Sequence, residues 1–132
     1  IELDDNFKNY LNDNLDNNEI FKKTLEEVLT NYGELFEVWF DGANGEGPNG
    51  KKQVYDWKGF VAVVRKHQPK ACIFSDGGPD VRWVGNENGF ANPTNWGTLN
   101  GDKVYPGYPQ YKELTSGHEN GTHWIPAECD VS

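Results

Sequence analysis

The chain has 132 residues, of which 36% are hydrophobic and 25% charged, and this is the composition of one globular domain with its own core. Its formal net charge of -9 disfavours nucleic acid as a partner, because a protein that neutralises phosphates normally presents a basic face. A neutral ligand fits better. No apolar run approaches the roughly 18 residues needed to span a bilayer, and the first residues show no basic-then-apolar secretion signal.

The N-terminal part of the chain predicts two helices. The first is a short helix within residues 1–17, where apolar residues recur at helical spacing. Asn18 is predicted to be the N-cap of the second helix, which Gly33 closes. The apolar residues that define the second helix are Ile20, Phe21, Leu25, Val28, Leu29 and Tyr32.

The middle of the chain alternates between strands and helices. Residues 35–41 form an apolar run that ends at Asp41 in a loop rich in glycine and asparagine, which is typical of a buried parallel strand. An amphipathic helix is predicted over residues 55–64 and ends before Pro69, and a second buried strand covers residues 71–76. This alternation predicts parallel β/α units.

From Asp80 onward the sequence predicts a long, turn-rich region that carries many aromatic and polar side chains. Two or three β/α units cannot close a barrel, which typically needs about 250 residues. We therefore expect residues 1–132 to be a partial catalytic β/α barrel domain, with the remaining strands outside this chain.

Carboxyl groups on neighbouring strand-end loops, surrounded by aromatic residues and an arginine, are what glycoside hydrolysis requires. One carboxylate attacks the anomeric carbon of the sugar, and the other protonates the leaving oxygen. Asp41 is the first candidate, although an aspartate after a strand is also a common turn former or helix cap. The five Trp, six Tyr and seven Phe suit a sugar-binding cleft and are equally ordinary core residues.

Over residues 29–132 the chain resembles the retaining α-L-fucosidases of glycoside hydrolase family 29, most of all the branch that acts on α-1,3- and α-1,4-linked fucose. The resemblance rests on segments 37–50, 55–57, 75–89 and 126–132, with the motifs Trp39-Phe40-Asp41-Gly42, Gly85-Asn86-Glu87 and Pro126-Ala127-Glu128-Cys129-Asp130-Val131-Ser132. It implies a (β/α)8-like, TIM-type barrel with parallel strands and long loops at their C-terminal ends, usually followed by a β-sandwich.

The resemblance also implies the partners and the surroundings of the protein. The partners would be fucosylated oligosaccharides or glycoconjugates and the remainder of the same enzyme chain. No metal or other cofactor is implied. The location would be periplasmic, secreted or lysosome-like.

The resemblance assigns Asp41 as the catalytic nucleophile and Glu87, 46 positions later (87 minus 41), as the acid/base. Glu128 is the rival for the acid/base role, because its motif places two acids beside an apolar segment. Arg82 matches the arginine that binds fucose, with a surface salt bridge as the alternative. Further substrate contacts are assigned to residues that could equally form turns or pack loops, namely Trp83, Glu46, Asn49, Asn86, Trp96 and Tyr108.

Other candidate sites are weaker. The spacing of His118 and His123 fits no standard zinc pattern, and Cys72 and Cys129 are expected to be free thiols. Two functions follow. The chain is expected to belong to an exo-acting α-L-fucosidase that works through a covalent fucosyl-enzyme, and the alternative is a non-catalytic fragment that binds fucosylated glycans.

Overall fold

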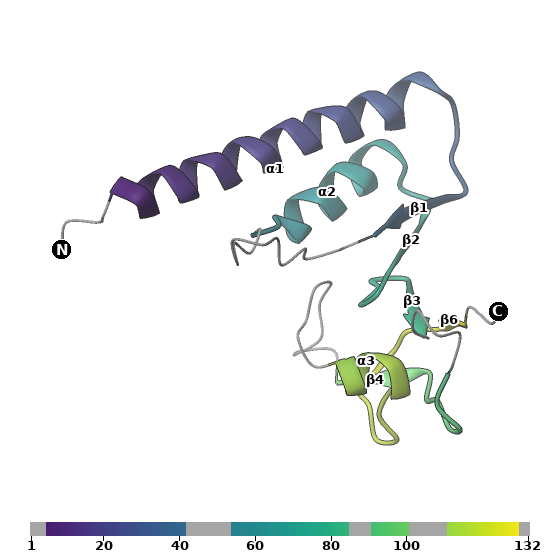
Figure 1. Cartoon of the computed structure of the whole chain (residues 1–132). Coiled ribbons are helices and arrows are strands. Elements are labelled where there is room, and N and C mark those ends of the chain that lie inside the picture. The colour runs from purple at the N-terminus through teal and green to yellow at the C-terminus, as the bar shows by residue number, and fades with distance from the viewer. Residues whose placement is uncertain (1–4, 42–53, 85–90, 101–110, 130–132) are drawn as a thin grey trace. The chain divides into compact units, whose positions relative to one another are not determined.

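The computed structural model describes residues 5–41, 54–84, 91–100 and 111–129, with side chains from residue 17 onward in the first range and from residue 114 onward in the last (Figure 1). The chain forms two compact units. The helical unit comprises Ile1–Leu35 and Asn44–Ala71, and the sheet unit comprises Phe36–Ala43 and Cys72–Ser132.

The helical unit begins with one long helix, α1 (Asp5–Asn31). The predicted helix boundary at Asn18 is wrong, because no glycine or proline interrupts these 27 residues and an interior asparagine costs a helix little. Asn18 is buried and makes a tertiary contact instead of a cap. Its side-chain amide donates to Val54 O at 2.9 Å and accepts from the backbone N–H of Asp56 at 3.2 Å. Gly33 follows the helix with a φ of 91°, as predicted for its closing residue.

The second helix of this unit, α2 (Trp57–His67), confirms the sequence prediction and runs beside α1 (Figure 1). Asp56 is its N-cap and accepts a hydrogen bond from Gly59 N at 3.0 Å. Gln68 is the C-cap, and Pro69 follows. The core between the two helices contains Leu25, Leu29, Phe60 and Val64.

The sheet unit is built on four parallel strands, which confirms the predicted α/β class with parallel strands. They are β1 (Glu37–Phe40), β2 (Cys72–Ser75), β3 (Val81–Val84) and β6 (Ala127–Cys129), in the spatial order β1-β2-β3-β6. Within the residues that the structure describes, these strands do not close into a barrel.

The prediction of an irregular region from Asp80 onward is wrong in part. It missed β3 and β6, and also the pair β4 (Thr98–Leu99) and β5 (His123–Trp124) and the short helix α3 (Tyr111–Ser116). Only residues 76–80 separate β2 from β3. The Asp80 carboxylate accepts the Ile73 N–H at 2.8 Å, so that β3 starts beside the end of β2. Strands of two to four residues paired over long distances leave little local pattern to detect.

The register of the strands separates the sheet into two faces, because in-register neighbours share a face and successive residues alternate. One face, here called the Arg82 face, includes the buried residues Phe40, Ile73, Ser75, Arg82 and Val84, and on β6 the exposed residues Ala127 and Cys129. The other, here called the Trp39 face, includes Glu37, Trp39, Phe74, Val81, Trp83 and Glu128. It is the more accessible face, with Trp39 62% exposed.

Candidate functional site

Asp41 follows the last residue of β1 directly and is exposed. It therefore stands at the C-terminal edge of the parallel sheet, where strand-end loops carry the chemistry in β/α barrels. Asp41 is two positions beyond Trp39, and in an extended chain this spacing places both on the same face. A carboxylate at this edge has access to a ligand that covers the Trp39 face.

Trp83 and Glu128 are the other two candidate residues that the structure brings together. Trp83 on β3 pairs in register with Glu128 on β6, and both belong to the Trp39 face. Glu128 is exposed, and no hydrogen bond or ion pair joins its carboxylate to another residue of the described ranges. The structure thus sets an aromatic ring and a carboxylate side by side on neighbouring strands.

The order of the strands sets the spacing of the backbones that carry Asp41 and Glu128. Three strand spacings of about 4.8 Å separate β1 from β6, which sets the two backbones about 14 Å apart. The carboxyl groups of a retaining pair lie about 5 to 5.5 Å apart. Only two spacings, about 10 Å, separate β1 from β3. Glu87 comes three positions after the end of β3 and lies outside the described residues.

Arg82 belongs to the opposite face and is fully buried, with 0% of its surface exposed. Its guanidinium donates to the backbone carbonyls of Leu114 and Trp96, and more weakly to Thr115 O at 3.4 Å. Burial lowers the pKa of the Arg82 guanidinium, and its buried Nε has no hydrogen-bond partner among the described residues. The alternative of a surface salt bridge is therefore wrong. Binding of fucose by Arg82 stays a prediction, and in this structure the side chain holds backbone carbonyls.

No protein-family model matches the chain. Over 120 residues it is 43% identical to alpha-L-fucosidase 1 of Arabidopsis thaliana, and the match covers 89% of this chain and 23% of that relative. The chain is similar to a segment of α-L-fucosidases. It spans about a quarter of the length of the curated relatives that it matches.

Solved structures give the same result. A glycoside hydrolase 29 family member from an unknown rumen bacterium is 41% identical with a TM-score of 0.65, over 85% of this chain and 22% of that chain. A glycoside hydrolase 29 fucosidase of Ruminococcus gnavus, crystallised in complex with fucose, is 31% identical with a TM-score of 0.64, over 86% of this chain and 25% of that chain. These matches support the α/β class and a fucosidase segment.

The remaining candidate substrate residues of this fucosidase-like segment are mostly outside the described ranges, and these are Glu46, Asn49, Asn86 and Tyr108. Trp96 is described and is 42% exposed. Its backbone is held on both sides, because its N–H donates to Ser116 O at 2.8 Å and its carbonyl accepts from Arg82. The indole of Trp96 therefore projects from a fixed point of the chain.

The histidines and cysteines show no site. The N–H of Asn120 donates to His118 Nδ1 at 3.1 Å, and Thr122 Oγ1 lies 2.9 Å from His123 Nδ1. Cys72 and Cys129 are free thiols on β2 and β6. Across the described ranges, no group of three or more His, Cys, Asp or Glu residues could hold a metal ion. In the same ranges, no helix has the length and hydropathy of a membrane span.

Gln68, which no sequence motif marks, joins the ends of α1 and α2. Its Nε2 donates to Leu29 O at 2.7 Å and Gly33 O at 2.8 Å, and its Oε1 accepts the Leu35 N–H at 3.2 Å. The only available signal was its position between the helical pattern and Pro69. Gln68 thus satisfies the Leu29 carbonyl, which the end of α1 leaves without a helical partner, and the Gly33 carbonyl just beyond the helix.

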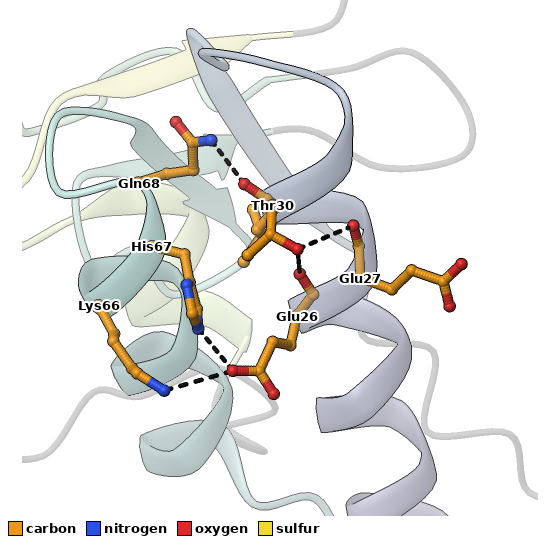
Figure 2. Close-up of polar contacts among 7 residues, drawn as sticks. Glu26, Glu27, Thr30, Lys66, His67 and Gln68 are labelled. Carbon is orange, nitrogen blue, oxygen red and sulfur yellow. Dashed lines mark hydrogen bonds and ion pairs between the residues drawn. The ribbon is translucent and has the colours of Figure 1, made fainter.

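A polar cluster beside Gln68 also links the helices (Figure 2). The carboxylate of Glu26 on α1 lies 2.8 Å from His67 Nε2 and 3.3 Å from Lys66 Nζ, both on α2. Hydrogen bonds from Lys66 and then from His67 lower the pKa of Glu26. The cluster is on the surface and has a structural role, because all its partners are within the helical unit.

Proposed function

We propose that this chain is part of the catalytic domain of a retaining, exo-acting α-L-fucosidase. The supporting observation is the position of Asp41, directly after a parallel strand, in a chain 43% identical to a segment of alpha-L-fucosidase 1. In this proposal the remaining strands of the barrel, and any β-sandwich, belong to other parts of a longer protein. The substrates are fucosylated oligosaccharides or glycoconjugates.

The reaction proceeds in two displacements. The ionised Asp41 carboxylate attacks the anomeric carbon of fucose, the bond to the leaving oxygen breaks, and Glu87 donates its proton to that oxygen. Glu87 then accepts a proton from water, whose oxygen attacks the same carbon and releases Asp41 as the carboxylate. The net result is hydrolysis of one glycosidic bond, with both carboxyl groups restored.

The strand order supports Glu87 over Glu128 as the acid/base. Glu87 comes three positions after β3 in the sequence, and β3 is one strand spacing nearer to β1 than is β6. Contacts to the sugar are proposed for Trp83, Glu46, Asn49, Asn86 and Trp96. Contact by Arg82 is also proposed, and it requires the guanidinium to leave the carbonyls of Leu114 and Trp96.

The proposed linkage preference is for α-1,3- and α-1,4-linked fucose and rests on the motifs around Asp41 and Glu87. It is tested by comparing the intact protein on a trisaccharide with fucose α-1,3- or α-1,4-linked to N-acetylglucosamine and on one with fucose α-1,2-linked to galactose. Faster release from the first supports the preference, and faster release from the second rejects it while leaving the hydrolase proposal intact.

The central experiment replaces Asp41 in the intact protein that carries this chain. Asp41→Asn should abolish turnover of an aryl α-L-fucoside, whereas Glu119→Gln, at an exposed glutamate of the same unit, should not. A 2-fluoro-fucosyl fluoride should leave a fucosyl adduct on the Asp41 peptide of the parent. Turnover by Asp41→Asn rejects the proposed nucleophile. A folded parent that binds fucosides without turnover supports the non-catalytic alternative.

A further inference from the structure

We propose that Glu128 is a substrate-binding residue that accepts a hydrogen bond from a hydroxyl group of the sugar, with the Trp83 ring as the apolar wall beside it. In this role Glu128 transfers no proton. The inference rests on the proposed function, because it assigns a further role within the same site. From the sequence motif at residues 126–132, Glu128 is the rival of Glu87 for the acid/base role.

The pairing of β3 with β6 is the first argument. Trp83 and Glu128 are directly in register, so their backbones lie about 4.8 Å apart and their side chains share one face. A pyranose presents apolar C–H surface and hydroxyl donors together. An aromatic ring beside a carboxylate matches both features, because the ring covers C–H groups and the ionised carboxylate only accepts hydrogen bonds.

The surroundings of Glu128 are the second argument. The carboxylate is exposed, and no cation or hydrogen-bond donor of the described residues pairs with it. The nearest arginine along the register is Arg82, which points to the opposite face and donates to carbonyls there. The acceptor capacity of Glu128 is therefore available on the same face as Trp39 and Trp83.

Glu128 on β6 and Asp41 directly after β1 lie at opposite edges of the described sheet. β1 and β6 are the outer strands of the four, with backbones about 14 Å apart, so Asp41 and Glu128 approach the site from opposite edges of the Trp39 face. Glu128 can thus contact the same sugar as Asp41 from the far side of the site.

The test measures kinetics of the intact protein and its variants Glu128→Gln and Glu128→Ala, with Glu119→Gln as the matched control. The substrates are 4-nitrophenyl α-L-fucoside and its 2-, 3- and 4-deoxy analogues. We expect Glu128→Ala to raise KM about tenfold with kcat changed by less than about threefold, and Glu128→Gln to have a smaller effect. For one deoxy analogue the loss should vanish, because the hydroxyl that pairs with Glu128 is absent.

Added azide distinguishes a Glu128 that binds the sugar from a Glu128 that transfers a proton. Azide should restore no turnover to Glu128→Ala. A fucosyl azide product, or a loss that grows as the leaving group becomes poorer, would identify Glu128 as the acid/base and overturn the inference. Unchanged kinetics, or an equal loss on all deoxy analogues, would also overturn it. An inactive parent would reject the proposed function itself, whereas an active parent with an unaltered Glu128→Ala rejects this inference alone.

Discussion

Lys22 Nζ lies 3.0 Å from Asp56 Oδ2, and this contact joins the middle of α1 to the N-cap of α2. The same Asp56 side chain accepts the Gly59 N–H at 3.0 Å. The hydrogen bond from Lys22 and then that from Gly59 lower the pKa of Asp56 below its ordinary value of 3.8. One carboxylate therefore caps one helix and holds the other.

Removal of this carboxylate should weaken the helical unit in a pH-dependent way. Asp56→Ala should lower stability by about 1 kcal/mol, typical for loss of an N-cap, whereas Asp56→Asn keeps the cap and loses the ion pair. The pKa of Asp56 is lower in the folded state, so its charge stabilises the fold above about pH 3.8 and this effect fades as the pH falls through the folded-state pKa.

The measurement is the melting temperature of the parent and of Asp56→Asn between pH 3 and pH 7. The two curves should differ at pH 7 and converge at the acid end. Glu27→Gln, at an exposed residue of α1, is the control for loss of a carboxylate. A difference that stays constant with pH would contradict the assignment to the Lys22–Asp56 contact.

Among the polar residues at the C-terminal ends of α1 and α2, replacement of Gln68 should lower the stability of the helical unit most. Gln68→Ala removes three hydrogen bonds at about 0.5 to 1.5 kcal/mol each, and Gln68→Glu should be worse at neutral pH, because a carboxylate then faces the carbonyls of Leu29 and Gly33. Amide hydrogen exchange of Leu35 reports the effect directly. Faster exchange is expected in Gln68→Ala, which removes the acceptor of the Leu35 N–H, and unaltered exchange there would show that the contact adds no stability.

The two helices of the helical unit and the first two strands could be predicted from the sequence because their signals are local. Leu25, Leu29, Phe60 and Val64 recur at helical spacing, and Gly33 and Pro69 mark the points where the helices end. The continuity of α1 through Asn18 could not be predicted, because its contacts come from residues 36 and 38 positions away.

For the candidate site, the strand-end position of Asp41 was predictable from its apolar run, but the pairing of Trp83 with Glu128 was not. The two residues are 45 positions apart (128 minus 83), and β3 and β6 have only four and three residues. The burial of Arg82 was equally hidden, because a lone arginine between valine and tryptophan gives no sign that backbone carbonyls will surround it.

Replacement of Arg82 should separate its structural role from a role in binding. Arg82→Leu leaves the carbonyls of Trp96 and Leu114 without their buried donor, and an unsatisfied buried group costs about 1 to 3 kcal/mol. Arg82→Lys should keep part of this stability, because lysine still supplies a donor. If the role is structural, thermal stability falls more for Leu than for Lys, and KM for an aryl fucoside stays within about threefold for the Lys variant. A large rise in KM with unaltered stability would instead indicate contact with fucose.

Gly117 should tolerate a side chain far less than Gly33, although both have positive φ angles of 68° and 91°. A β-carbon at Gly33 would meet nothing within 4 Å, so Gly33→Ala should cost only the left-handed strain of about 1 to 2 kcal/mol. A β-carbon at Gly117 would overlap the carbonyl oxygen of Trp96 and lie 2.9 Å from its carbonyl carbon. That carbonyl is the acceptor for Arg82, so Gly117→Ala must displace the chain at Trp96 and the donor behind it. Chemical denaturation should therefore show a markedly larger loss of unfolding free energy for Gly117→Ala than for Gly33→Ala. Equal losses would show that the chain at Trp96 can shift without a loss of stability.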